Sequence, residues 1–276
     1  MQIKKRALVQ KFFADRGTHL AAMIAYYALV AFVPLTFLCL ALLGLAHRAD
    51  ASDFFVRQLE RAFPNSSVST ILSVLHSIQD NAAALGIIGG VFLLWSALGL
   101  FSALESAINI VYGRPNRSFL HGKALADGLM IVSLVALFGA LLIGSIGAET
   151  VRHYLPGLAH VYVVAYALSV AASLAGIFVF LFAIYATLPN TEIGMWEALP
   201  GAVLAAIVLE ASFQILPLFV RHANLNVTLR ALGGPVLLLV WLYLMANAVV
   251  FGAELNWWVA RRREASHAAE EIPGLA

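Results

Sequence analysis

The sequence is poor in charged residues and contains a single cysteine. Asp, Glu, Lys and Arg make up 12% of its 276 residues, whereas about a quarter of a typical globular domain is charged. Hydrophobic residues make up 62%, and the mean hydropathy is +0.88. Cys39 lies in the first apolar run and has no second cysteine with which to form an intramolecular disulfide. This composition is that of an integral membrane protein, with no room for a separate soluble domain.

The motifs of the common hydrolases and nucleotide-binding enzymes are missing from the sequence. Its eight histidines lack metal-ligand spacing, and there is no HExxH, CxxC, G-x-S-x-G or GxxxxGK[ST]. We therefore predict that the protein is not an enzyme and uses neither a metal nor a cofactor. The formal net charge is only +2, and Lys and Arg lie at the ends of apolar runs rather than in one basic stripe. This distribution argues against nucleic-acid binding.

Long apolar runs dominate the chain and predict transmembrane helices. At about 1.5 Å per residue, each is long enough to cross a hydrocarbon core of about 30 Å. The predicted spans cover residues 20–46, 83–112, 124–149, 160–188, 196–220 and 231–258. Pro34 lies in the middle of the first span and should kink it. The predicted fold is all-α and polytopic, with one six-span membrane domain over 1–260 and a basic, polar tail without regular structure over 261–276.

Two further segments have amphipathic patterns. The basic amino terminus carries Ile3, Leu8, Phe12 and Phe13 at positions that predict a short helix lying on the membrane surface. The polar connection over 47–81 repeats apolar residues at helical spacing in both of its halves. It predicts two short amphipathic helices in the first external loop, over one mouth of the bundle or in the interface.

The distribution of Lys and Arg predicts the orientation of the spans. With six spans both termini share one side of the membrane, and that side holds eleven Lys and Arg residues against six on the other. Because positive residues favour the cytoplasmic side, we expect both termini in the cytoplasm of a bacterial cell, with the protein in the inner membrane.

Three carboxylates within the spans are the most informative polar residues: Glu105, Glu210 and Glu254. An ionised carboxylate at mid-bilayer costs at least about 2.5–3.5 kcal/mol, so it normally faces the bundle interior and finds a partner. One interpretation is a shared polar cavity that forms a translocation pathway. The alternative for Glu105 and Glu254 is helix packing near span ends, with Arg114, Arg117 or residues 261–263 as partners. For Glu210, nearer mid-span, we favour function or a deliberate internal hydrogen bond.

Several uncharged polar residues lie near these carboxylates along the helices. The candidate cavity residues beside the carboxylates are Asn109, Gln214, Tyr243, Asn247, Tyr26 and Tyr27. The candidate contacts for anionic head groups are Arg114, Arg117 and Lys123. The fourth span also carries a face of Tyr and Ser residues, including Tyr166 and Ser173, for which we favour helix packing and modest hydrogen bonds over a ligand groove.

Five stretches spread in order over nearly the whole chain resemble the YihY/BrkB family of bacterial inner-membrane proteins. They read AAMIAYYALVAFVPL, LLWSALGLFSALESAINIVYG, YATLPN, WEALPGAVLAA and LLLVWLYLMANAVVFGAELN. The resemblance implies a six-span inner-membrane protein linked to envelope integrity, serum resistance and transport of lipids or lipopolysaccharide precursors. The family has also carried a ribonuclease label, but the exposed loops here supply neither metal-binding carboxylates beside a basic groove nor paired histidines.

Three functions are consistent with these features. The leading hypothesis is a transporter or flippase-like carrier of a lipid or lipid-linked envelope precursor, with membrane lipids as its partners. The runner-up is an envelope scaffold that transports nothing, and the third is an ion-coupled carrier of a small solute. Protein partners are not identified by the sequence, and assembly into a homo-oligomer stays open.

Overall fold

The computed structural model describes residues 8–45, 82–118, 159–222 and 227–270, together with 124, 128–129, 131–133 and 135–136. All regular structure within these ranges is helical. The helices are α1 (Leu8–Ala14), α2 (Gly17–Leu45), α5 (Ala82–Tyr112), α7 (Ala159–Thr187), α8 (Met195–His222) and α9 (Val227–Glu270). In this part of the chain, 5 helices are long and apolar enough to cross a membrane. The predicted all-α polytopic fold is thus confirmed.

Two predictions fall wholly or largely outside the described residues. The third predicted span, over 124–149, is described at only a few positions, and those are helical. The two amphipathic helices predicted over 47–81 lie outside the described ranges, as does Lys123. The count of six spans therefore stays a prediction.

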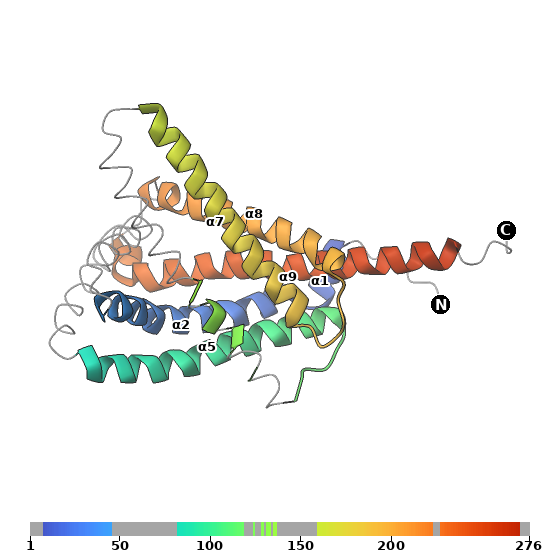
Figure 1. Cartoon of the computed structure of the whole chain (residues 1–276), viewed down its shortest axis with the longest axis horizontal. Coiled ribbons are helices and arrows are strands. Elements are labelled where there is room, and N and C mark those ends of the chain that lie inside the picture. Colours follow the sequence, from blue (N-terminus) through green and yellow to red (C-terminus); the bar gives the residue numbers. More distant parts are fainter. Residues whose placement is uncertain are drawn as a thin grey trace.

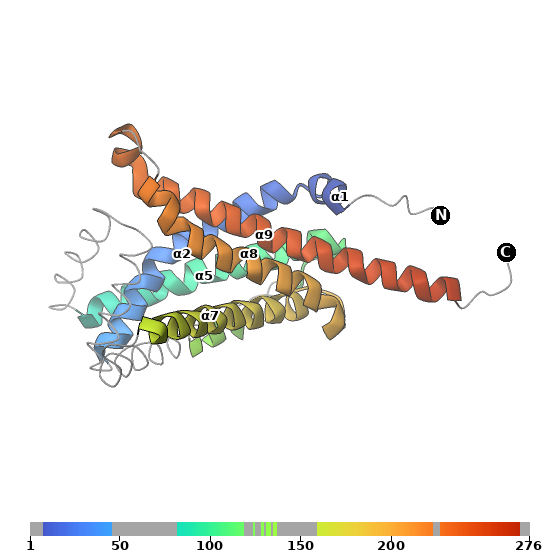
Figure 2. The same cartoon turned by 90° about the horizontal axis from the view of Figure 1, so that it is seen from above.

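Helix α9 is the centre of the bundle (Figures 1 and 2). It packs against α1, α2, α5 and α8, while α2 also packs against α5, and α7 packs against α8. Pro34 lies inside α2, and Figure 2 shows this helix changing direction along its length. Helix α7 is the least buried of the five candidate spans and crosses the bundle at an angle in Figure 1.

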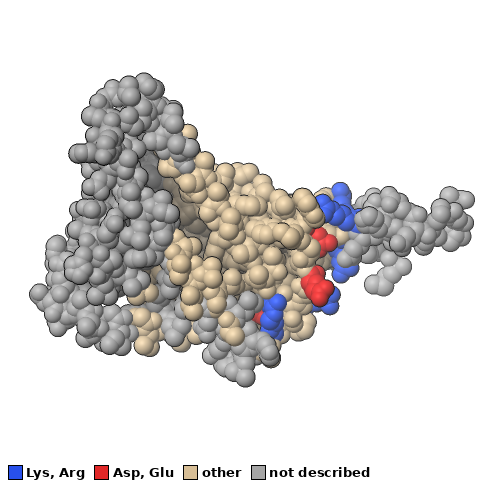
Figure 3. Space-filling view, in the orientation of Figure 1, with Lys and Arg blue, Asp and Glu red and all other residues tan. Residues whose placement is uncertain are grey.

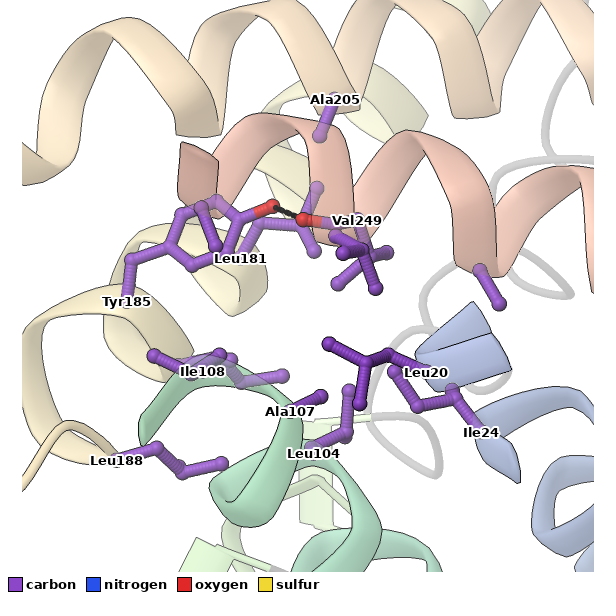
Figure 4. Close-up of a cluster of buried hydrophobic side chains, with 14 of the residues drawn as sticks. Leu20, Ile24, Leu104, Ala107, Ile108, Leu181, Tyr185, Leu188, Ala205 and Val249 are labelled. Atoms are coloured by element: carbon purple, nitrogen blue, oxygen red, sulfur yellow. Dashed lines mark hydrogen bonds between the residues drawn. The ribbon is translucent and has the colours of Figure 1, made fainter. Parts of the chain in front are cut away.

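The tightest packing lies at the end of the bundle nearest α1, which we call the α1 end. There α8 and α9 touch backbone to backbone: a Cβ on Gly201 would lie 2.1 Å from the carbonyl oxygen of Gly252. The Gly201 amide donates to Asn256 Oδ1 at 2.6 Å, and Tyr185 of α7 donates its hydroxyl to the Val249 carbonyl at 2.7 Å. Figure 4 shows Tyr185 and Val249 within the buried cluster that joins these helices. Small residues therefore allow three helices to meet closely here.

The end of α9 differs from the prediction for the tail. We expected residues 261–276 to lack regular structure, but α9 continues through 261–270 and ends at Glu270. Ala, Arg and Glu, which are strong helix formers, dominate this segment. In addition, the Arg262 guanidinium lies 3.6 Å from the ring centroid of Trp258, one turn earlier, and such cation–π contacts are favourable. Residues 271–276 lie outside the described ranges.

The charged side chains on the face drawn in Figure 3 gather toward the α1 end, and the rest of the described surface on that face is uncharged. This segregation is expected of a membrane protein whose interfacial end carries the charge and whose spans face hydrocarbon. Four charged residues of the described part are nevertheless buried, namely Lys11, Glu105, Glu210 and Glu254.

Candidate functional site

A chain of hydrogen bonds links α7 and α8 within the span region, and we call it the polar seam. Glu210 Oε1 accepts from Gln214 Nε2 at 2.8 Å, and Glu210 Oε2 accepts from Ser173 Oγ at 2.6 Å. Gln214 Oε1 in turn accepts from the Tyr166 hydroxyl at 2.7 Å. The predicted pairing of Glu210 with Gln214 is confirmed, and the Tyr and Ser face of the fourth span makes the interhelical hydrogen bonds that its pattern predicted.

Helical spacing brings these four side chains together. Glu210 and Gln214 are i and i+4 on α8, and Tyr166 and Ser173 are i and i+7 on α7, so each pair occupies one face of its helix. Glu210 lies fifteen residues after Met195, the first residue of α8, which places it about 22 Å along the helix axis from that end. Glu210 therefore lies near the middle of α8 and five residues before the end of the candidate span Met195–Ile215.

The seam is buried at the carboxylate and open elsewhere. Glu210 is 7% exposed, whereas Tyr166 is 60% exposed, and Ser173 and Gln214 are exposed. A polar group entering from the exposed side would meet a hydroxyl or an amide first and the carboxylate behind them. The arrangement can accept hydrogen bonds from a ligand and can donate few in return, because Glu210 is an acceptor without donors when ionised.

A second polar group lies at the α1 end, and we call it the Lys11 cluster. Lys11 Nζ donates to Asp15 Oδ2 at 2.5 Å, to Glu254 Oε2 at 2.7 Å and to the Val111 carbonyl at 2.9 Å. An ammonium group has three protons, and all of them are used. The same Nζ lies 4.2 Å from the ring centroid of Trp257. Glu254 is fully buried, so this ion pair joins α1, α5 and α9 inside the protein.

The Lys11 cluster corrects the predicted place of the amino-terminal helix. We expected a helix lying on the membrane surface through Phe12 and Phe13. The structure does form α1, and Phe13 is 62% exposed, but Phe12 is only 7% exposed and Lys11 is buried. Phe12 packs against Phe251 of α9 with ring centroids 5.7 Å apart. Helix α1 is therefore part of the bundle on this face, because it supplies the counter-charge of Glu254.

Glu105 pairs with Arg117, one of the partners that the sequence suggested. Its Oε1 accepts from the Arg117 backbone amide at 3.2 Å, and Arg117 Nη1 lies 3.8 Å from the same oxygen. The guanidinium also donates to the carbonyls of Thr187 at 3.0 Å, Pro189 at 2.8 Å and Leu188. These are carbonyls at and just past the end of α7, which the helix itself cannot satisfy. Arg117 thus fixes the loop after α5 to the end of α7.

Asn109 belongs to the same loop contact rather than to the carboxylate one turn earlier. Its Oδ1 accepts from the Asn190 backbone amide at 2.7 Å, and its Nδ2 donates to Asn116 Oδ1 at 3.2 Å. Asn190 Nδ2 donates to the Pro115 carbonyl at 3.0 Å. Asn109 is fully buried, so it holds two loops together from within the bundle.

The remaining candidate residues are dispersed. Asn247 donates to the Tyr243 carbonyl of its own helix at 2.7 Å and not to Glu254, and Tyr243 packs against the apolar core. Tyr26 is 59% exposed, while Tyr27 is half-buried and its ring contacts the position of Gly99. Arg114 is exposed on the loop after α5.

The contacts described for the three carboxylates share no partner. Glu105 pairs with Arg117, Glu254 with Lys11, and Glu210 with Ser173 and Gln214. The contacts therefore divide the predicted single cavity into separate sites. Sequence reasoning missed Lys11 as a buried ion-pair partner; its i, i+4 spacing to Asp15 was a signal for the local pair alone. It also missed the contacts of Asn116 and Asn190 with Asn109, because no motif or spacing in the sequence indicates them.

No group of three metal-ligating side chains comes together among the described residues. The features that do come together are apolar spans, a buried ion pair and a polar seam between two spans. They define the class of the protein as a polytopic, all-α integral membrane protein.

The chain belongs to the Virulence factor BrkB family, whose model matches residues 8–273. The family resemblance seen in the sequence is thereby confirmed. No solved structure matches the chain.

Several curated bacterial proteins are similar to nearly the whole chain. The putative ribonuclease-like protein YfkH of Bacillus subtilis (strain 168) is 25% identical over 94% of this chain and 96% of its own length. A UPF0761 membrane protein of Chromohalobacter salexigens is 28% identical over 94% of this chain and 64% of its own length. A UPF0761 membrane protein of Aromatoleum aromaticum is 28% identical over 98% of this chain and 66% of its own length. The chain thus spans less than two thirds of the length of these two UPF0761 proteins.

Proposed function

We propose that the protein is a flippase-like carrier that moves a lipid or lipid-linked envelope precursor between the leaflets of the bacterial inner membrane. The observation that supports this function is the polar seam, in which Glu210 is buried within a candidate span and its hydrogen-bonding neighbours reach the exposed side of α7 and α8. Both termini face the cytoplasm in this proposal, as the Lys and Arg distribution favours.

The seam suits an amphiphile because of where its polar groups lie. A head group crossing hydrocarbon loses its hydration, and each unsatisfied polar group costs several kcal/mol there. Tyr166, Gln214 and Ser173 offer hydrogen bonds from an exposed helix face, so a head group could be satisfied while its acyl chains stay in lipid. This geometry lowers the barrier for an amphiphile more than it would for a small hydrophilic solute, which would leave one side facing lipid.

The proposal assigns no catalytic step to the chain. The sequence has no phosphate-binding GxxxxGK[ST] motif, so movement would follow an existing gradient without nucleotide hydrolysis. The word ribonuclease-like describes YfkH. For this chain we propose no nuclease activity. The described residues bring together no metal-binding group. The Arg117 guanidinium, which could otherwise contact a phosphate, instead pairs with Glu105 and donates to the end of α7.

Reconstitution tests this function directly. Purified protein is inserted into vesicles that carry tail-labelled phospholipid, and the labelled lipid that becomes accessible to a membrane-impermeant quencher is followed with and without a pH gradient or membrane potential. We expect faster redistribution than in protein-free vesicles. Replacement Glu210→Leu should slow it by about tenfold or more, since one lost interaction of about 1.4 kcal/mol at the barrier has that effect.

The matched control is Glu192→Leu, since Glu192 is exposed on the turn between α7 and α8. It removes the same charge outside the seam and should leave the rate unchanged. Wild-type redistribution no faster than in empty vesicles under every gradient contradicts the carrier function and favours the envelope scaffold. Uptake of a small solute without lipid movement would favour the ion-coupled carrier.

A further inference from the structure

We propose that the polar seam selects head groups by charge, taking a zwitterionic, ammonium-bearing phospholipid in preference to one of net negative charge, with Glu210 as the specificity-determining residue. This inference rests on the proposed function and deepens it. It differs from the role expected of the basic loop residues, which would attract anionic lipid at the membrane surface.

The first observation is that no described side chain supplies a counter-charge to Glu210. Among the described residues, the ion pairs involve Asp15, Glu105 and Glu254, and Glu210 makes none. The sequence from 159 to 220, which includes all of α7 and most of α8, contains no Lys or Arg. Glu210 is therefore a buried carboxylate within a candidate span, and its described side-chain partners are uncharged, namely a hydroxyl and an amide.

The second observation is the unused acceptor capacity of the seam. A carboxylate has about four lone-pair positions, and the seam fills one on each oxygen of Glu210. The Tyr166 hydroxyl, which donates to Gln214, can still accept. An ammonium group brings three donors and a positive charge to such a set, whereas a phosphate without a compensating cation brings only acceptors and a negative charge.

The position of the seam amplifies this difference. Charges interact several times more strongly in a protein or lipid interior than in bulk water, because the effective dielectric constant is lower. A head group of net negative charge would be repelled by Glu210 with no Lys or Arg in the neighbouring 159–220 segment to offset the repulsion. The phosphate of a zwitterionic lipid would carry its own ammonium to the carboxylate, so the same seam would tolerate it.

The test compares two tracer lipids in one vesicle composition. Tail-labelled phosphatidylethanolamine and tail-labelled phosphatidylglycerol are each added at trace level, so that the bulk surface charge is the same. With the wild-type chain we expect the zwitterionic lipid to redistribute about tenfold faster, which corresponds to about 1.4 kcal/mol. In Glu210→Gln, which keeps the size and one acceptor but removes the charge, the two rates should approach each other. The matched control Glu192→Gln should keep the wild-type ratio.

The outcomes separate this inference from the function on which it rests. If both lipids move at equal rates in the wild type, or the anionic lipid moves faster, the charge selection is wrong and the carrier function survives. If neither lipid moves faster than in protein-free vesicles, the carrier function is wrong and the selection falls with it. The wild-type ratio decides whether the seam selects by charge. The Glu210→Gln ratio decides whether Glu210 sets the preference, and an unchanged ratio in that variant contradicts this role. If Glu210→Gln fails to fold, the wild-type ratio still tests the selection.

Discussion

The Lys11 cluster and the polar seam place a glutamate inside the same bundle in opposite surroundings. Glu254 is fully buried against an ammonium whose three protons are all donated within the protein. Glu210 is buried beside uncharged donors, and the chain of hydrogen bonds that starts from it ends at an exposed tyrosine. Glu254 accepts from Lys11 through Oε2, while its buried Oε1 has no hydrogen-bond partner among the described residues. The difference between the two glutamates is therefore one of charge: Glu254 is compensated by a cation that joins helices, whereas Glu210 is held only by neutral groups. We infer that the α1 end is structural and the seam is functional.

The largest expected effect comes from breaking the ion pair of the Lys11 cluster. Replacement Lys11→Met leaves Glu254 buried without its counter-charge, and loss of one partner of a buried pair typically costs about 3–5 kcal/mol. We expect a decrease of this size in the free energy of unfolding, measured by denaturant titration in detergent micelles.

The double variant Lys11→Met with Glu254→Gln is the matched control, because it removes both charges. It should recover part of the lost stability, since no uncompensated charge remains. The ion pair does not hold the α1 end together if Lys11→Met leaves the free energy of unfolding unchanged. The same conclusion follows if the double variant lowers this free energy by more than the two single variants combined.

A smaller effect is expected where α8 and α9 touch. In Gly201→Ala the new Cβ would lie 2.1 Å from the Gly252 carbonyl oxygen, so one backbone must shift. Overpacking of this kind costs about 1–3 kcal/mol. The control is Gly176→Ala on α7, where a Cβ meets nothing within 4 Å. The thermal midpoint should fall for the first variant and not for the second, and an equal fall in both would contradict the difference in packing between the two regions.

The smallest expected effect on stability belongs to the seam. Ser173→Ala removes one interhelical hydrogen bond to Glu210, and such bonds in membrane proteins average about 0.6 kcal/mol. The free energy of unfolding in micelles should fall by no more than this amount. Ser169→Ala is the control, because the described hydrogen bond of Ser169 is to the Tyr166 carbonyl of its own helix and joins no two helices. A loss of several kcal/mol at Ser173 would show that the seam holds the bundle together and would remove its contrast with the Lys11 cluster.

The parts of the structure that sequence alone predicts are those set by short-range periodicity. Apolar runs indicate the spans, because hydrocarbon thickness fixes their length. The bond between Glu210 and Gln214 follows from i, i+4 spacing on one helix. The pairing of Glu105 with Arg117 was one of a few options near the end of the same span. In each case the partners are close in the chain.

The parts that escape prediction depend on contacts between distant segments. Lys11 and Glu254 are 243 residues apart, and a lysine in a basic amino terminus usually faces water or lipid head groups. For Glu254 the sequence therefore indicates arginines near the span ends, including those at 261–263 of its own helix, as partners. The continuation of α9 to Glu270 was missed for a different reason, because polarity indicates the end of a span and does not indicate the end of a helix.

The ion pair between Lys11 and Glu254 also imposes an order on assembly. Chains are synthesised from the amino terminus, and early segments begin to fold first. Lys11 is synthesised 243 residues before Glu254, so its ion-pair partner does not yet exist while the helices between them are being made. Helix α1 can contact α2 and the Val111 carbonyl of α5 before then, but its contacts with Glu254 and Phe251 can form only after α9 has been made.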